Sequence, residues 1–259
     1  MKKLVKNRRF WKNIILFSAS IFILITVIII IWLSYLKIPD FSSFQDRKVI
    51  NSTKIYDRTG EILLYDIHRD SKRTDIASEA MGVNIKNATV AIEDSEFYNH
   101  GGIRFISIVR AVLSNFFGSG KTQGGSTITQ QLVKNVLLTQ EKSYTRKIKE
   151  WVLAIKIDNS MKKEKILEYY LNESPYGGNV YGIEQASKTY FNKDAVDLTL
   201  AEAAYLAAIP QSPTTLSPYG KNKDKLEARK NLVLSRMLEL NFISQANYAK
   251  TKNEEVTFF

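Results

Sequence analysis

The chain begins with a basic polar segment that is followed by an uninterrupted apolar run. Ile14 to Leu36 contains 23 residues without a charged side chain. As a helix this run would be about 35 Å long, enough to cross a hydrocarbon core of about 30 Å. It is too long for the apolar region of a cleaved signal peptide, and no small-x-small pattern follows it. We therefore predict a retained transmembrane helix over residues 14–36, behind a basic tail at residues 1–13.

The segment after the apolar run changes from irregular to patterned. Residues 37–51 are polar and irregular, which favours a juxtamembrane linker. Ser52 to Tyr65 alternates apolar and polar residues around Asp57-Arg58-Thr59-Gly60, a pattern typical of a short hairpin. Residues 52–250 form one predicted domain, and residues 251–259 are a tail or the start of a linker.

From about Ala88 onward the spacing of apolar residues becomes helical. They recur every three or four residues, which predicts helices at Leu132–Leu138, Ile148–Ile157, Lys163–Leu171, Ile183–Tyr190, Leu200–Ile209 and Leu226–Leu240. Three prolines make Ile209–Tyr219 an extended connection. Apolar residues cover most of a helix circumference in Phe105–Phe117, as expected of a buried helix or of a segment that dips into a membrane face. The domain is predicted to be mainly α.

Composition restricts the chemistry. The formal charge of +11 includes six cations of the N-terminal tail, so the rest of the chain carries 11 − 6 = +5 and nucleic acid is not an expected partner. The same tail places the N-terminus inside and the domain outside the membrane. With no cysteine and only two histidines, catalysis must come from carboxylates, hydroxyls or cations.

A glycine-led helix start is the first candidate site. Gly124-Gly125 precedes Ser126 and Thr127, and Thr127 with Gln130 has the spacing of a capping box. The simpler interpretation is a well-capped helix. The alternative is that free backbone N–H groups and the helix dipole attract a phosphate, with Gln131 and Lys134 on the next turn.

A row of cations follows within one helix. Lys142, Arg146 and Glu150 are spaced i, i+4 and i+8 and share one face, with Lys147 beside them. A solvated salt-bridge ladder is the alternative, but Arg146 stands N-terminal to Glu150, the less favourable order for such a pair.

Two adjacent carboxylates form the third candidate. Glu93 and Asp94 follow an apolar stretch and precede Phe97 and Tyr98, so one carboxylate could be partly desolvated while its neighbour points elsewhere. Desolvation would suit a general base. An exposed helix-end acid is the simpler interpretation, and His100 fits a hydrogen-bonded structural role better than a catalytic one.

Together these segments resemble the peptidoglycan glycosyltransferases, glycosyltransferase family 51, in order, spacing and residue type. The resemblance covers about Ser52 to Ala249. It rests on the segments Glu93–Gly101, Gly124–Gln131, Arg146–Glu150, Lys165–Asn172 and Leu198–Ala207, with Gly178, Gly182, Pro210 and Pro213.

The resemblance implies a lysozyme-like helical domain with a small membrane-proximal jaw, tethered by one transmembrane helix in the cytoplasmic membrane. It implies polymerisation of lipid II into β-1,4-linked glycan, with inversion at the anomeric carbon and release of undecaprenyl pyrophosphate. Its expected partners are lipid II, the growing lipid-linked glycan, the membrane, and proteins of cell-wall synthesis or division.

The resemblance also implies roles for individual residues. Glu93 corresponds to the general base, with Asp94, Phe97 and His100 supporting it. The residues implied to bind substrate are Ser126, Thr127, Gln130, Gln131, Lys134, Lys142, Arg146 and Lys147. Glu150 corresponds to a second acid that orients these cations or holds a divalent ion such as magnesium or manganese. Lys142 stands where arginine is common, and Arg104 where aspartate is frequent.

Other functions remain open from sequence. A lysozyme-like muramidase also needs two acids, but gives no reason for the cations. A catalytically silent, membrane-tethered scaffold would not need both acids. Many family members carry a second, penicillin-binding transpeptidase domain, so a monofunctional enzyme and the glycosyltransferase part of a longer protein are both compatible. Ser160-Met161-Lys162-Lys163 matches the Ser-x-x-Lys pattern of that second domain, but it lies in the helical region and we predict no such role.

Overall fold

The structure is a computed structural model that describes residues 2–35, 53–56, 58–59, 63–67, 72–104, 106, 125–138 and 144–259. The chain divides into two compact units, Met1–Pro39 and Asp40–Phe259. The predicted linker, nearly all of Phe105–Phe117, and Lys142 lie outside the described residues. The small membrane-proximal jaw subdomain expected from the sequence stays a prediction.

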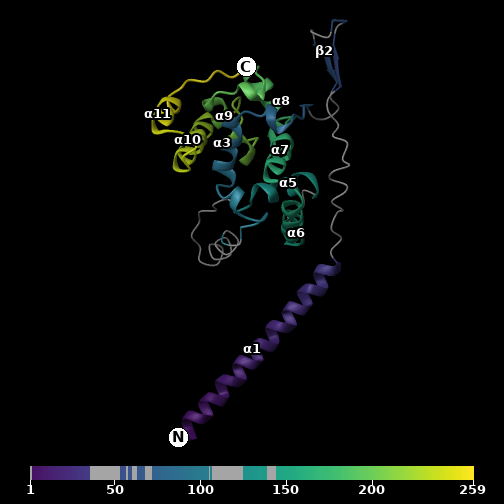
Figure 1. The fold of residues 1–259 in the computed structure, drawn as a ribbon, viewed down its shortest axis with the longest axis vertical. Helices are drawn as coiled ribbons and strands as arrows, with labels where there is room; N and C mark the ends of the chain where they lie inside the picture. The colour runs from purple at the N-terminus through teal and green to yellow at the C-terminus, as the bar shows by residue number, and fades with distance from the viewer. Residues whose placement is uncertain are drawn as a thin grey trace. The chain divides into compact units, whose positions relative to one another are not determined.

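The first unit contains one long helix, α1 (Lys2–Tyr35), drawn in purple in Figure 1. Its segment Phe10–Ile28 has the length and apolar composition needed to cross a membrane. Hydroxyl groups within the apolar part are bonded inside the helix, as when Thr26 Oγ1 donates to the Phe22 carbonyl at 2.8 Å. This pairing lets polar side chains sit in an apolar medium without an unsatisfied donor. The predicted apolar helix is therefore present.

The second unit begins with the predicted hairpin. Strands β1 (Thr53–Tyr56) and β2 (Leu63–Ile67) pair antiparallel, with Thr53 opposite Ile67. The register shifts between Ile55 and Tyr56. The alternating pattern therefore located both strands correctly, although β2 extends two residues beyond the predicted end.

Helices make up most of the rest of the second unit, which confirms the mainly α prediction. The α-helices are α3 (Val83–Glu93), α5 (Ile128–Val136), α6 (Tyr144–Ser160), α7 (Lys163–Glu173), α8 (Ile183–Phe191), α9 (Leu200–Ala208), α10 (Lys223–Glu239) and α11 (Gln245–Lys252). Short 3-10 turns lie at Ser78–Ala80, Phe97–Asn99, Ala195–Asp197 and Ile209–Gln211.

These helices pack in two groups that α8 joins. Helices α3, α9 and α10 contact one another, while α5 packs against α6 and α7. Helix α8 contacts both α7 and α9 (Figure 1). Alanines at 201, 203, 204, 207 and 208 are buried in α9 and allow its neighbours to approach closely. The last residue of α3 therefore lies where both groups can reach it.

A small sheet attaches the start of the domain to α7. Strand β5 (Val180–Tyr181) pairs parallel with β3 (Lys72–Arg73) and antiparallel with β4 (Pro175–Gly177). The buried Arg73 guanidinium reaches both carboxylate oxygens of Glu173, at 2.6 and 2.8 Å. Such a bidentate pair fixes direction as well as distance.

Several boundaries differ from the sequence predictions. Helix α3 starts at Val83, before the predicted helical region, and α5 starts at Ile128 because its cap lies at Thr127. The predicted extended connection Ile209–Tyr219 is instead a series of turns that begins with the 3-10 turn at Ile209–Gln211. Pro210 fits the second position of this turn, because the turn does not use the backbone N–H that proline lacks.

The C-terminal tail lies against the core. The Phe258 ring packs 5.2 Å from the rings of both Phe191 and Tyr205. The Phe259 backbone N–H donates to the Tyr190 carbonyl at 3.0 Å, while the Phe259 side chain is 71% exposed. The tail is thus held by one inward ring and its backbone.

Candidate active site

Glu93, the predicted base, is the last residue of α3 and its carboxylate is held from one side. Gln131 Nε2 on α5 donates to Glu93 Oε2 at 2.6 Å. The side chain is 11% exposed. Oε1 has no hydrogen-bond partner among the described residues. Oε2 therefore has a fixed donor, whereas Oε1 is buried and accepts no hydrogen bond from the described residues.

A cation from the other helix group faces the free oxygen. Arg229 Nη2 on α10 lies 3.5 Å from Glu93 Oε1, and the Arg229 side chain is 17% exposed. Burial lowers the pKa of Arg229, while the charge of Glu93 opposes that shift. The sequence predictions did not include Arg229, because nothing in its helical spacing separates it from the exposed cations of α10.

Two buried tyrosines complete the surroundings of Glu93. The Tyr170 hydroxyl approaches Gln131 Oε1 at 3.5 Å. Burial, with a smaller contribution from the Glu93 charge, raises the pKa of both Tyr170 and Tyr176. The wall beside Glu93 is therefore partly aromatic and buried.

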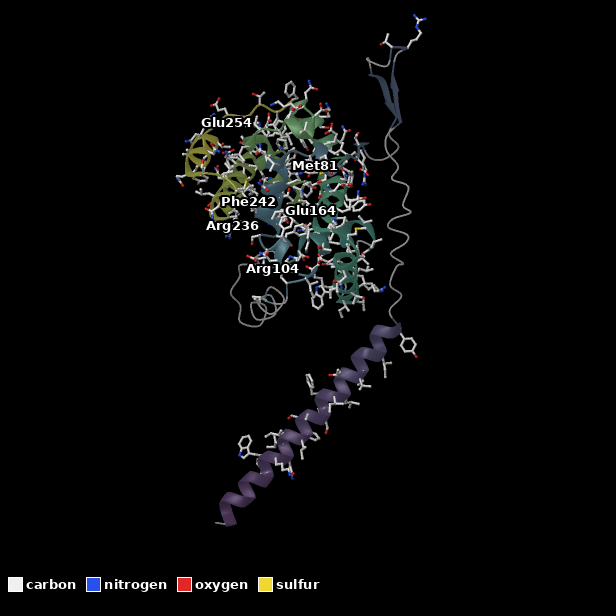
Figure 2. All side chains as sticks on the ribbon, viewed as in Figure 1. Met81, Arg104, Glu164, Arg236, Phe242 and Glu254 are labelled. Carbon is white, nitrogen blue, oxygen red and sulfur yellow. The ribbon has the colours of Figure 1, made fainter. Side chains whose placement is uncertain are left out.

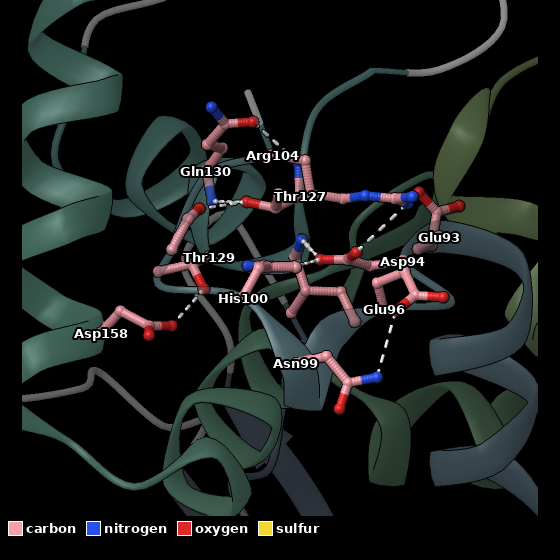
Figure 3. Close-up of polar contacts among 12 residues, drawn as sticks. Glu93, Asp94, Glu96, Asn99, His100, Arg104, Thr127, Thr129, Gln130 and Asp158 are labelled. Atoms are coloured by element: carbon pink, nitrogen blue, oxygen red, sulfur yellow. Dashed lines mark hydrogen bonds and ion pairs between the residues drawn. The ribbon is translucent and has the colours of Figure 1, made fainter. Parts of the chain in front are cut away.

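Asp94 points away from Glu93 and joins three chain segments. Its side chain is 1% exposed, and Oδ2 accepts hydrogen bonds from His100 Nε2 at 2.9 Å and from the Ile128 backbone N–H at 3.1 Å. Arg104 Nη1 lies 3.9 Å from Oδ1 (Figure 3). The adjacent carboxylates thus separate as predicted. Glu93 faces the site, while Asp94 joins His100 and the start of α5 in a set of buried contacts that we call the frame.

The predicted capping box at the start of α5 is present and occupies its donors. Thr127 Oγ1 accepts from Gln130 N at 3.1 Å, and Gln130 Oε1 accepts from Thr127 N at 2.8 Å. Together with the Asp94 bond, this uses the backbone N–H groups of residues 127, 128 and 130. Three N–H groups of this helix start therefore have partners within the chain, and the hypothesis that the helix start binds phosphate stays a prediction. Thr127 and Gln130 are each 1% exposed, so their contacts are with the frame.

Lys147 and Glu150 form a second polar cluster beside the same helix start. Lys147 Nζ donates to Ser126 Oγ at 2.8 Å and to Glu150 Oε1. Arg146 Nη1 lies 3.7 Å from Glu150 Oε2. Glu150 is 2% exposed, whereas the Lys147 side chain is 36% exposed. A buried carboxylate therefore anchors two cations that reach toward the surface.

The surroundings of Glu150 do not fit a divalent cation. Two cations already flank its carboxylate, and metals prefer sites where several oxygen ligands converge. No group of three or more histidine, aspartate or glutamate side chains suited to a metal was found in the part of the chain that the structure describes. The predicted magnesium or manganese ion stays a prediction.

The remaining predicted residues occupy distinct positions. Lys134 is exposed on α5, three residues after Gln131 and so on the same helix face. Phe97 is fully buried, 6.4 Å from the His100 ring. Lys142 is not described. These positions make Phe97 and His100 parts of the frame and leave Lys134 accessible.

Lys163 ties the segment with the Ser-x-x-Lys match to the loop that contains His100. Its Nζ contacts Asp158 Oδ1 and the His100 carbonyl, each at 2.6 Å. Ser160 Oγ donates to the Ile157 carbonyl at 3.0 Å. Ser160 and Lys163 therefore have separate partners within the fold, and the fortuitous nature of their motif match stays a prediction.

Helix α5 links the two acids. Ser126, two residues before the helix, contacts the Lys147–Glu150 cluster, and Gln131 in its first turns contacts Glu93. The structure thus brings the Glu93 carboxylate and an anchored pair of cations to one short element.

Comparison with known proteins shows the family of the chain. Residues 60–238 match the protein family described as Transglycosylase. The chain is 39% identical over 239 residues to penicillin-binding protein 1A of Aquifex aeolicus, covering 90% of this chain and 32% of that protein. It is 40% identical over 248 residues to penicillin-binding protein 1F of Bacillus subtilis, covering 94% and 33%. The chain thus spans about a third of the length of these relatives.

A solved structure is also similar. Penicillin-binding protein 1A of Haemophilus influenzae superposes with a TM-score of 0.47 at 23% identity, covering 81% of this chain and 21% of that one. The family match spans well over half of the present sequence and contains both helix groups and both acids. This chain belongs to the transglycosylase family.

Proposed function

We propose that the protein is a peptidoglycan glycosyltransferase that polymerises lipid II into β-1,4-linked glycan strands. The observation that carries the proposal is the state of Glu93. Gln131 fixes Oε2, and Oε1 has no hydrogen-bond partner among the described residues. A general base needs such an oxygen within hydrogen-bond reach of the proton that it removes.

In the proposed reaction, the 4-hydroxyl of an incoming N-acetylglucosamine donates its proton to Glu93 Oε1. The hydroxyl oxygen attacks the anomeric carbon of N-acetylmuramic acid on the growing glycan, which inverts that carbon. The bond from this carbon to the pyrophosphate oxygen breaks, and undecaprenyl pyrophosphate leaves with the electron pair. Glu93 then returns its proton to water.

The departing pyrophosphate gains negative charge, so preorganised cations stabilise the transition state most. Lys134, Arg146, Lys147 and Lys142 are proposed for this role, with Ser126 beside them. Glu150 is proposed to orient Lys147 and Arg146, because its buried carboxylate contacts both. We assign Gln131 to Glu93, and Thr127, Gln130, Asp94, Phe97 and His100 to the frame. No step requires a metal ion.

The substrate explains the anchor. Lipid II is a membrane lipid, so a domain tethered by α1 in the cytoplasmic membrane would remain near it. We propose a single pass with the N-terminus inside and residues 52–250 outside, in line with the basic tail. The membrane, lipid II and its polymer are then the partners, with proteins of cell-wall synthesis or division as further candidates.

Incubation of the full chain with lipid II, followed by gel separation of glycan products, tests this proposal. Wild type should make polymer, with and without a chelator. Glu93→Gln should be slower by about 10²–10⁴-fold, the usual contribution of a general base. Glu96→Gln is the matched control, since Glu96 is exposed and its Oε2 contacts only Asn99 among the hydrogen bonds described.

Three results would contradict parts of the proposal. Shortening of preformed glycan without polymerisation would indicate a muramidase. Wild-type rates in Glu93→Gln would remove the base assignment. Loss of polymerisation on chelation, restored by magnesium or manganese, would show that the reaction needs a metal after all.

A further inference from the structure

Arg229 is a buried cation that faces the reactive side of Glu93. It comes from α10, in the helix group opposite to the one that supplies Gln131. Its Nη2 lies 3.5 Å from Glu93 Oε1, and the two side chains are 17% and 11% exposed. The contact therefore lies mostly out of water, where charge interactions are stronger.

Arg229 does not have the contacts of a residue kept for fold stability alone. Burial lowers its pKa, and its Nε has no hydrogen-bond partner among the described residues. Burying a guanidinium is unfavourable unless charges and hydrogen bonds compensate for it. Arg73 shows the alternative in this chain, with bidentate contacts to Glu173 and a further contact to Asp75.

The distance between Arg229 and Glu93 matters as much as the contact. A separation of 3.5 Å is longer than the usual 2.9–3.0 Å of an N–H···O hydrogen bond. Arg229 can therefore hold the carboxylate by charge while Oε1 keeps a lone pair for another donor. A closer arginine would compete with the substrate hydroxyl for that oxygen.

We infer that Arg229 is a positioning residue for Glu93: it holds the carboxylate by charge from the α10 side, opposite Gln131, and leaves Oε1 without a hydrogen-bond donor. The inference rests on the proposed function. Each carboxylate oxygen of Glu93 is then held by a residue from a different set of helices, Oε2 by Gln131 and Oε1 by Arg229. The orientation of the base therefore depends on the packing of α10 against α3 as well as on α5.

The test compares Arg229→Met and Arg229→Lys with wild type in lipid II polymerisation. Arg236→Met is the matched control, because Arg236 lies on the same helix and its 47% exposed side chain pairs with Glu239 at the surface (Figure 2). All three variants are first compared with wild type by circular dichroism and thermal unfolding. Arg229→Lys keeps the charge and provides a folded variant if Arg229→Met does not fold.

We expect kcat of Arg229→Met to fall by about 100-fold, the loss that a small misplacement of a reacting group can cause. KM should stay close to wild type, because Arg229 holds the base and does not bind the substrate. The kcat of Arg229→Lys should lie between those of Arg229→Met and wild type. Added guanidinium should restore part of kcat in Arg229→Met. Arg236→Met should resemble wild type, with no response to guanidinium.

A wild-type kcat in folded Arg229→Met would overturn the inference. So would a raised KM with unchanged kcat, which would make Arg229 a substrate contact. If Arg229→Met does not fold, Arg229→Lys and Arg229→Gln are compared in its place. Wild-type kcat in both of these variants would also overturn the inference. Absence of polymer from wild type itself would overturn the proposed function, and the inference with it.

Discussion

The Asp94 carboxylate accepts a hydrogen bond from the backbone N–H of Ile128 at 3.1 Å, across 34 residues of sequence. Ile128 is the first residue of α5, and Asp94 directly follows Glu93. The start of α5 is therefore tied to the backbone of the proposed base. This bond, with that of His100, makes Asp94 the centre of the frame behind the site.

Asp94→Asn should weaken this frame. An amide keeps the volume but loses the charge that strengthens both hydrogen bonds, which are worth about 1.5–3 kcal/mol each when one partner is ionised. We expect a loss of about 2–3 kcal/mol in the free energy of unfolding by urea, with slower polymerisation. Asp197→Asn, at an exposed position, should change stability by less than about 0.5 kcal/mol. Equal stability of the two variants would contradict the role of Asp94.

Glu150 and Lys147 should behave as a unit. Glu150→Gln leaves Lys147 without its buried anchor, so we expect polymerisation to fall by about 10²-fold. Lys147→Met should cause a similar loss. Because the two side chains contact each other, the double variant should lose far less than the product of the two single effects. Initial rates of lipid II polymerisation are measured for wild type, the two single variants and the double variant. Strictly multiplicative losses would show that the residues act independently.

Gly102 allows the loop after Glu93 to pack on α6. Its φ is +81°, and a Cβ there would lie 2.5 Å from the Ala154 carbonyl oxygen. Gly102→Ala should therefore cost about 2–4 kcal/mol, from the left-handed backbone and the displacement of α6. Gly101→Ala is the matched control, since a Cβ at Gly101 meets nothing within 4 Å. Urea denaturation of both variants measures the difference, and similar midpoints would refute the steric argument.

Buried phenols should limit stability at alkaline pH. Burial raises the pKa of Tyr170 and Tyr176 above their ordinary value near 10. Below about pH 10, the folded and unfolded chains both hold these protons, so the phenols add no pH dependence. Above it, the unfolded chain loses them first, and the free energy of unfolding falls as pH rises.

The urea midpoint should therefore fall between about pH 10 and 12. Tyr176→Phe removes one of these protons and should flatten the fall. Tyr181→Phe, at a side chain that is 36% exposed, should leave the slope unchanged. An equal slope in Tyr176→Phe and wild type would contradict the prediction.

The tail should stabilise the domain through one ring. Phe258 packs on Phe191 and Tyr205, so Phe258→Ala should cost about 1.5–3 kcal/mol, the value of burying a large apolar side chain. Phe259→Ala should cost less than about 0.5 kcal/mol, because that side chain is 71% exposed. Thermal unfolding of the two variants separates them, and the reverse order would disprove this description of the tail.

The sequence predicted elements whose signals are local. The hairpin, the helices α6 to α10 and the capping box follow from alternation, from three-four spacing and from Thr127 with Gln130. The separate directions of Glu93 and Asp94 were also predictable, since they adjoin an apolar stretch. The short sheet joining residues 72 and 180 was not, because pairing of such short strands depends on contacts far apart in sequence.

The site was less predictable than the elements. The bond of Asp94 to a backbone N–H of the glycine-led helix start could not be foreseen, because the two lie 34 residues apart. Arg229 was missed for the same reason, because its partner lies on a distant helix. The resemblance, and no local sequence signal, supplied the proposed roles of Glu93 and the cations.

The step from Glu93 to Asp94 separates two adjacent acids. Glu93 ends a helix, and Asp94 follows in a non-helical conformation, with φ −159° and ψ 77°. Because Asp94 leaves the helix at this point, its carboxylate turns to His100 and Ile128, while that of Glu93 meets Gln131. Two adjacent residues of like charge thus belong to different hydrogen-bond networks, and the order Glu-Asp decides which carboxylate enters which network.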